Sequence, residues 1–201
     1  MRVLVVEEVP GDAAVASQAL VAAGHEITSC HRNGSAFPCR GIGASPECPI
    51  EAEGVDVALL VRSLPGSQPT AREDGVRCAL RRHIPLVIAG EVDQSPYSSM
   101  ATAVETDLDR APAAVEAAAA APLPFHGDVA SDALRTVLTA EGLSAEGADA
   151  TVRRHGTQLL VTLRPGVDVD QKVVEIAAIR VLASVRALDP HASMIDVSLG
   201  T

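Results

Sequence analysis

Three short and nearly continuous apolar runs limit the fold of this chain more than any other feature. They are Val3–Val6, Val55–Val61 and Ile84–Ala89. Such runs are typical of strands that are buried on both faces, as in a parallel sheet. Between the first run and a candidate strand at His25–Ser29, the segment Ala13–Ala23 has helical spacing and stops at Gly24. This β-α-β unit predicts a right-handed crossover and a parallel α/β sheet.

Further segments extend the same pattern. Thr70 is followed three positions later by Glu73, a capping-box pattern that predicts a helix from about Ala71 to Arg82. Ala101–Glu105 is a candidate fifth strand, and Ala111–Ala121 is an alanine-rich helix. These elements predict an α/β domain over the first half of the chain.

The second half has a different pattern. Pro122-Leu123-Pro124 begins a predicted stiff linker, 122–130, between a domain at 1–121 and a small domain at 131–201. The sequence of the small domain predicts a helix at 131–141, a hairpin with strands at 150–154 and 158–163, a long helix at 168–188 and a strand at 194–199. We expect Asp168 to cap the long helix, and the broad apolar face of that helix, which includes Leu182, to pack in the core. The order αββαβ predicts an α+β fold.

Charge and composition narrow the classes of partner. The net charge of −10 repels nucleic acid phosphates and anionic lipid, so we expect neither nucleic acid nor membrane as a partner. The Val3–Val6 run is too short for a signal peptide, which favours the cytoplasm. The alanine- and valine-rich, lysine-poor composition is associated with GC-rich bacterial genomes.

Three stretches of the first half are similar to the response-regulator receiver family. Val3–Glu8 resembles its first strand and acidic pair, Asp56–Gly66 its third strand and following turn, and Ile84–Ile88 its fourth strand. The resemblance covers about half of the chain. It implies a flavodoxin-like, doubly wound parallel sheet. The second half resembles, in topology alone, the small α+β modules of the alkaline-shock and BON types, which implies a binding or assembly role.

The resemblance also implies which residues would carry phosphoryl chemistry. Glu7 and Glu8 match the acidic pair that holds magnesium in the family, whereas Val61 stands at the phospho-acceptor position and Gly90 at the hydroxyl position. A valine has no nucleophilic oxygen and cannot form an acyl phosphate. The only lysine, Lys172, lies far from the proposed fifth strand, where the family has one. The site therefore resembles a degenerate receiver site.

Two function classes follow from these positions. The first is a non-catalytic pseudo-receiver, a regulatory or adaptor module that binds a protein partner or a second copy of itself. The other is an enzyme that uses Glu7 and Glu8 as an acid/base pair in the cleft at the carboxyl ends of the strands. We find no phosphate-binding loop and no nucleophile elbow. We expect the scattered histidines His126, His155 and His191 at the surface.

Four cysteines favour a third function class. Cys30, Cys39 and Cys48 are spread over a proline- and glycine-rich segment, 30–54, where a helix would be expected, and Cys78 lies in the helix that follows the third strand. Four thiolates suffice for a zinc or iron–sulfur site, which would order such a loop and could act as a redox or metal sensor. The spacing lacks a Cys-x-x-Cys pair, so buried thiols and a redox pair remain alternatives.

Overall fold

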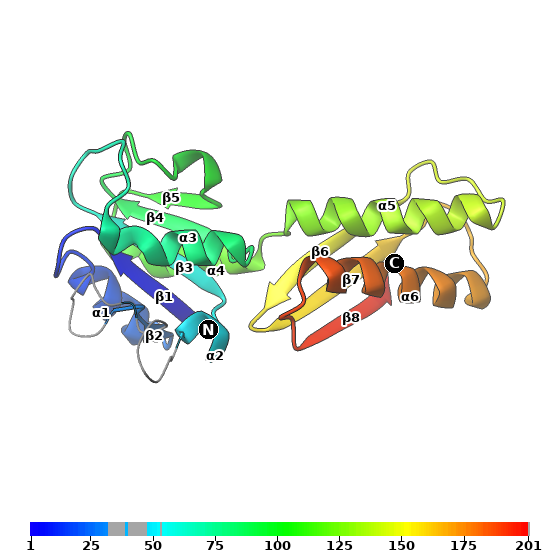
Figure 1. Ribbon diagram of the computed structural model, residues 1–201, viewed down its shortest axis with the longest axis horizontal. Helices are drawn as coiled ribbons and strands as arrows, with labels where there is room; N and C mark the ends of the chain where they lie inside the picture. The colour runs from blue at the N-terminus through cyan, green and yellow to red at the C-terminus, as the bar shows by residue number, and fades with distance from the viewer. Residues whose placement is uncertain (32–38, 40–47, 53, 201) are drawn as a thin grey trace. The chain divides into compact units, whose positions relative to one another are not determined.

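The chain forms two compact units, Met1–Ala121 and Pro122–Thr201 (Figure 1). The computed structural model describes residues 1–31, 39, 48–52 and 54–200. Each unit has its own sheet and its own apolar core.

The first unit is built on a five-stranded sheet in the order β2-β1-β3-β4-β5, with every neighbouring pair parallel. The strands are β1 (Arg2–Glu7), β2 (Glu26–Thr28), β3 (Val57–Arg62), β4 (Leu86–Gly90) and β5 (Ala103–Glu105). This order confirms the predicted flavodoxin-like, doubly wound fold. The central strand β3 is buried along its whole length, as its apolar sequence requires.

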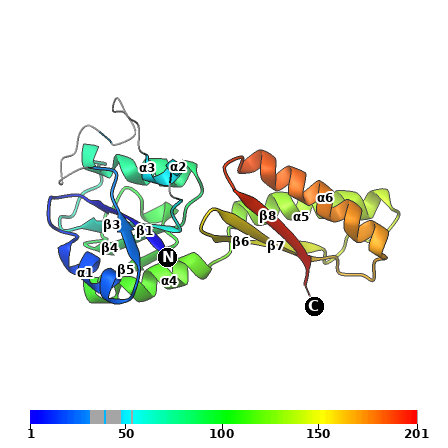
Figure 2. The ribbon, with the colours of Figure 1, turned by 90° about the horizontal axis from the view of Figure 1, so that it is seen from below.

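Helices cover both faces of this sheet, as Figure 2 shows. α1 (Ala14–Ala22) and α4 (Ala111–Ala120) pack on one face, and α3 (Asp74–Arg81) packs on the other. Short 3₁₀ turns lie at η3 (Ala71–Glu73), η4 (Ser98–Met100) and η5 (Leu108–Arg110). The alternation of side chains along the strands divides the core into two layers.

The same alternation decides where the polar end of β3 points. Val57, Leu59 and Val61 face the layer beneath α1 and α4, whereas Ala58 and Leu60 face the layer beneath α3. Because successive side chains of a strand alternate between faces, Arg62 follows Ala58 and Leu60 toward the α3 side.

Part of the predicted helix-less segment 30–54 is helical. A four-residue helix, α2 (Pro49–Ala52), lies just before β3, and its Ile50 packs against the α3-side core. The proline at its first position suits a helix N-terminus, because that residue needs no backbone donor. Residues 32–38, 40–47 and 53 of the predicted loop lie outside the described residues.

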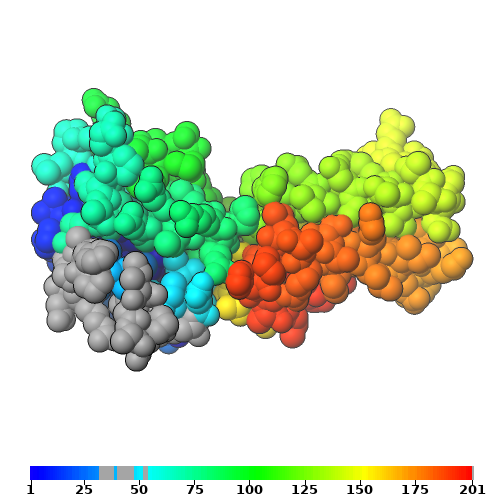
Figure 3. All heavy atoms as spheres, viewed as in Figure 1, coloured from blue at the N-terminus to red at the C-terminus, as the bar shows by residue number. Residues whose placement is uncertain are grey.

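The second unit has the predicted αββαβ order, with a three-stranded sheet ordered β6-β7-β8. Its elements are α5 (Pro124–Ala140), β6 (Asp149–His155), β7 (Gln158–Arg164), α6 (Gln171–Leu188) and β8 (Met194–Leu199). β6 and β7 form an antiparallel hairpin, and β8 pairs in parallel with β7. The helices α5 and α6 lie side by side (Figure 3) and share one core with the sheet.

Three details of the second unit differ from the expectations. α5 begins at Pro124, so most of the predicted linker 122–130 is helical; proline at a first helical position explains the start. Asp170, not Asp168, caps α6, because its side chain accepts a hydrogen bond from the Val173 N–H (2.8 Å). Leu182 is 41% exposed. The buried face of α6, formed by Val173, Ala177, Val181 and Val185, is therefore narrower than the apolar face expected from the sequence.

Candidate functional site

Glu7, Glu8, Val61 and Gly90, the four positions singled out by the predicted resemblance, meet at the carboxyl ends of β1, β3 and β4. In the strand register Glu7 lies beside Val61, and Arg62 lies beside Gly90. The Glu8 backbone N–H donates to the carbonyl oxygen of Val61 (3.1 Å). In doubly wound sheets, this edge is where ligands bind. The positions identified from the sequence are therefore neighbours in the fold.

Val61, which the resemblance would place at a phospho-acceptor position, is part of the core. Its side chain is 1% exposed and belongs to the apolar layer beneath α1, together with Val5 and Val3. An aliphatic group buried in this way offers no nucleophile and no hydrogen bond to a ligand at the strand ends. The role of Val61 is to pack in the apolar core.

At Gly90, which the resemblance would place at a hydroxyl position, the backbone accepts only glycine. Gly90 has a φ of +89°, and a Cβ built on it would lie 2.3 Å from the carbonyl oxygen of Arg62. The same carbonyl accepts a hydrogen bond from the Glu91 N–H (2.8 Å), which keeps the two strand ends close together. A serine or threonine would be strained here and would also collide with the Arg62 backbone.

The centre of the site is a buried arginine. The Arg62 side chain is 1% exposed, and its Nη2 lies 2.7 Å from Oε1 of Glu8. Its Nε lies 3.2 Å from Oε1 of Glu73, and its Nη1 donates to the carbonyl oxygen of Gly66 (2.7 Å). The carboxylates are also buried, with side-chain exposures of 9% for Glu8 and 0% for Glu73. One guanidinium thus joins the ends of β1 and β3 to η3.

The other member of the acidic pair has a separate partner. Oε1 of Glu7 lies 3.1 Å from Nη2 of Arg72, and its Oε2 accepts a hydrogen bond from the Gly11 N–H (2.8 Å). Both carboxylate oxygens of Glu7 are therefore engaged. The acidic pair predicted from the sequence is present, but each member is paired with an arginine.

Sequence reasoning missed Arg62, Arg72 and Glu73. Glu73 was identified only as a helix-capping residue, and it does accept a hydrogen bond from the Thr70 N–H (2.6 Å). The period-two alternation of β3 was the available signal, because it directs Arg62 toward the α3 face, where a charge needs a partner. The identity of that partner depends on long-range packing.

Several buried polar atoms around Arg62 have no hydrogen-bond partner among the described residues. They are Oε2 of Glu8, the Tyr97 hydroxyl and Nε of Arg72. Nε of Arg62 and Oε1 of Glu73 are paired with each other as ions at 3.2 Å, without hydrogen-bond geometry. Burial and then the negative charge of Glu73 raise the pKa of Tyr97 above its ordinary value, so this phenol stays protonated. The surroundings of Arg62 are polar, buried and incompletely satisfied.

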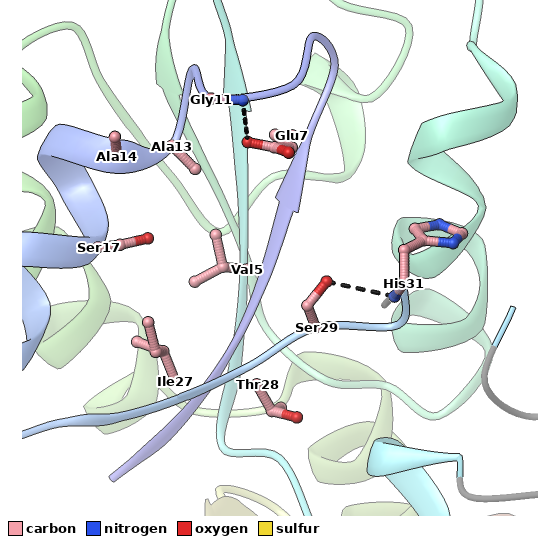
Figure 4. A pocket seen from close by; sticks show the side chains of 10 residues that line it. All are labelled: Val5, Glu7, Gly11, Ala13, Ala14, Ser17, Ile27, Thr28, Ser29 and His31. Carbon is pink, nitrogen blue, oxygen red and sulfur yellow. Dashed lines mark hydrogen bonds between the residues drawn. The ribbon is translucent and has the colours of Figure 1, made fainter. Parts of the chain in front are cut away.

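A pocket of about 440 Å³ opens beside this site, between α1 and the end of β2 (Figure 4). β2 pairs with β1 only as far as Leu4, whereas β3 pairs with β1 as far as Glu7. The chain leaves the sheet after Thr28 and opens the space. The pocket is lined by Val5, Glu7, Gly11, Ala13, Ala14, Ser17, Ile27, Thr28, Ser29 and His31. Its walls combine small apolar groups with hydroxyls.

Two of the cysteines, Cys30 and Cys78, lie at α3. Sγ of Cys30 would lie 3.1 Å from a Cβ at Gly75, so it packs against the helix one turn before Cys78. Burial raises the pKa of the Cys78 thiol, and the charges of Cys39 and Cys48 add to the rise. None of these four cysteines is in a disulfide bond among the residues that the structure describes. Among the residues that the structure describes, no three or more His, Cys, Asp or Glu side chains form a group that could hold a metal ion.

The second unit contains a buried charged cluster of its own. Asp189, which caps the C-terminus of α6, makes an ion pair with Arg154 of β6, and its Oδ2 lies 3.7 Å from Nε2 of His126. Burial disfavours the ionised carboxylate, but hydrogen bonds and charge from His126 and Arg154 outweigh this and hold the pKa of Asp189 well below its usual value. His126, in α5, is 1% exposed, so its predicted surface position was wrong. Its buried imidazole is compensated by the nearby carboxylate of Asp189.

Comparisons add no family to these observations. No family model matches the chain, and no curated protein matches it. None of the helices in the described part of the chain is long and apolar enough to cross a membrane.

Proposed function

We propose that this protein is a non-catalytic pseudo-receiver, a regulatory or adaptor module that acts by binding a protein, with a small α+β binding module attached. The observation that carries the proposal is the identity of the residues at the three positions where phosphoryl chemistry would need reactive groups. A valine, a conformationally obligatory glycine and a buried arginine stand where phosphoryl chemistry would need an acceptor, a hydroxyl and a metal.

Exposure to a phosphoryl donor tests this proposal. We expect no gain of a phosphoryl group, measured by intact-protein mass spectrometry, when the protein is incubated with acetyl phosphate and MgCl₂. The variant Val61→Asp adds a carboxylate at this position and tests whether the lack of an acceptor oxygen is the only obstacle to phosphorylation. It also buries a carboxylate in an apolar layer, so we expect it to be less stable by several kcal/mol, on the order of 3. Phosphorylation of the unaltered protein would refute the proposal.

The turn after β3 is the candidate partner surface of the first unit. Leu64 is 56% exposed, and the turn that carries it is fixed by the Arg62–Gly66 hydrogen bond. A fixed, exposed apolar side chain is suited to a protein contact, which could be a different protein or a second copy of this chain.

A photocrosslinking residue at position 64 tests the surface. Val21 on α1 has nearly the same exposure, 57%, and provides the matched control. We expect a crosslinked protein adduct from position 64 in cells and none from position 21. Sedimentation of the purified protein then shows whether the partner is a second copy. No adduct from position 64, or equal adducts from both positions, would count against this surface.

A cysteine-based metal or redox sensor is the second candidate. It is favoured by the position of Cys30, which packs against α3, the helix that carries Cys78, although the described residues contain no group of three potential metal ligands. Thiolates suit zinc or an iron–sulfur cluster, and the expected cytoplasmic location would keep these thiols reduced. Zinc and iron analysis and the visible spectrum of anaerobically purified protein decide between the two candidates. A metal-free protein that remains folded after Cys→Ser replacement at all four positions would exclude the metal sensor.

A further inference from the structure

The charges around Arg62 do not balance. Two carboxylates, Glu8 and Glu73, share one guanidinium, and all three side chains are at least nine-tenths buried. Moving ionised groups out of water is costly unless opposite charge compensates them at close range. The two carboxylates therefore require a cation at this point in the fold, and Arg62 is the cation that they contact.

A free metal ion does not fit beside this arginine. The receiver resemblance implies a magnesium ion on the acidic pair, but Oε1 of Glu8 is 2.7 Å from Nη2 of Arg62 and Glu7 is engaged by Arg72 and Gly11. A divalent ion at Glu8 would lie against the guanidinium, and the two positive charges would repel. The residues present disagree with a magnesium site.

We propose that the Arg62 guanidinium is a tethered cation that replaces a free divalent ion. Glu8 and Glu73 then form a cation site that becomes available to a metal ion when Arg62 is replaced by a shorter, uncharged residue. Because the guanidinium is covalently attached to β3, it cannot dissociate. The unaltered domain therefore keeps this site filled at any metal concentration.

Other atoms at the site are suited to a replacement ion. Oε2 of Glu8 is buried without a hydrogen-bond partner, and the carbonyl oxygen of Gly66 loses its donor when Arg62 is removed. Hard divalent cations prefer carboxylate and carbonyl oxygens. A divalent charge would also match the two carboxylates better than one guanidinium does.

The variant Arg62→Ala tests the inference through thermal unfolding in EDTA and in millimolar MnCl₂. We expect the unaltered protein to unfold at the same temperature in both. The variant should unfold at a lower temperature in EDTA and recover by roughly 5 °C or more with Mn²⁺, because an ion that binds only the folded state stabilises it. Electron paramagnetic resonance should show one more bound Mn²⁺ per chain in the variant than in the unaltered protein.

Two controls test whether the additional ion binds at Glu8 and only where Arg62 has been removed. In Arg62→Ala/Glu8→Gln, the recovery with Mn²⁺ and the additional bound ion should both disappear. Arg72→Ala removes an arginine of the same region whose partner, Glu7, is 22% exposed. We expect it to gain no Mn²⁺ dependence, because water can solvate that carboxylate.

If Arg62→Ala is unfolded in EDTA, refolding upon addition of Mn²⁺ supports the inference. If it is unfolded in both conditions, Arg62→Gln, which keeps most of the side-chain volume, decides the matter by the same measurements. The tethered-cation inference is overturned if neither variant responds to Mn²⁺ in stability or binding. That result leaves the proposed function intact, because the phosphoryl-donor experiment on the unaltered protein tests it separately.

Discussion

At the scale of single residues, the site is defined by what each position excludes. Val61 is buried and apolar, and Gly90 has a backbone conformation that only glycine adopts without strain. Arg62 then supplies the positive charge that the buried glutamates need. These three positions are mutually consistent, because the carbonyl of Arg62 is the atom that prevents a side chain at Gly90.

Gly90→Ala is expected to destabilise the protein strongly. Its Cβ would lie 2.3 Å from the Arg62 carbonyl oxygen, so strain at φ +89° is combined with a backbone collision, and we expect a loss of about 3 kcal/mol or more. Gly24→Ala is the control. It has a φ of +83° with nothing within 4 Å, and should cost only about 1 kcal/mol. Urea unfolding measures both; equal losses would contradict the collision.

Asp189→Asn is expected to alter the acid stability of the second unit. Because the pKa of Asp189 is lowered in the folded state, its ionised form contributes stability above its unfolded pKa of about 4, and this contribution is lost as the pH falls below that value. We expect Asp189→Asn to be less stable at pH 7, by about 3 kcal/mol, with a smaller difference from the unaltered protein at pH 2 to 3.

The control for Asp189 is Asp132→Asn, because the Asp132 side chain is 79% exposed. Unfolding followed by circular dichroism as a function of pH should show parallel curves for Asp132→Asn and the unaltered protein. A constant difference between Asp189→Asn and the unaltered protein from pH 7 to 2 would contradict the role assigned to the carboxylate.

At the scale of elements, the start of α6 shows how two similar residues acquire different roles. Asp168 and Asp170 both precede the helix, but only the Asp170 side chain accepts the Val173 N–H. We expect Asp170→Ala to lower stability by about 1 kcal/mol and Asp168→Ala to change it by a few tenths. Thermal unfolding compares the pair, and a larger effect at Asp168 would restore the sequence-based assignment.

At the scale of the whole molecule, each unit has the core that it needs. The apolar cluster of the second unit contains only residues from Leu123 to Val197. We expect a polypeptide of residues 122–201 to fold alone and to unfold cooperatively, as monitored by circular dichroism and amide NMR dispersion. An NMR spectrum with the narrow amide dispersion of an unfolded chain would show that this unit is not an independently folding domain.

Much of the fold could be predicted because its signals are local. The apolar runs that became β1, β3 and β4 are recognisable within a few residues, and the hairpin and long helix of the second unit follow from short-range periodicity. Proline misled the prediction at two places. At Pro49 and Pro124 it was interpreted as a loop or linker residue, whereas it begins a helix in the structure.

The sequence by itself determined the doubly wound sheet, the apolar side chain at Val61 and the acidic pair at Glu7 and Glu8. Only the tertiary structure decided what those glutamates do. Arg62 and Glu8 are 54 positions apart in the chain, and their contact exists because parallel pairing brings the ends of β1 and β3 together. Strand periodicity is a local property, whereas compensation of a buried charge depends on every element that surrounds it.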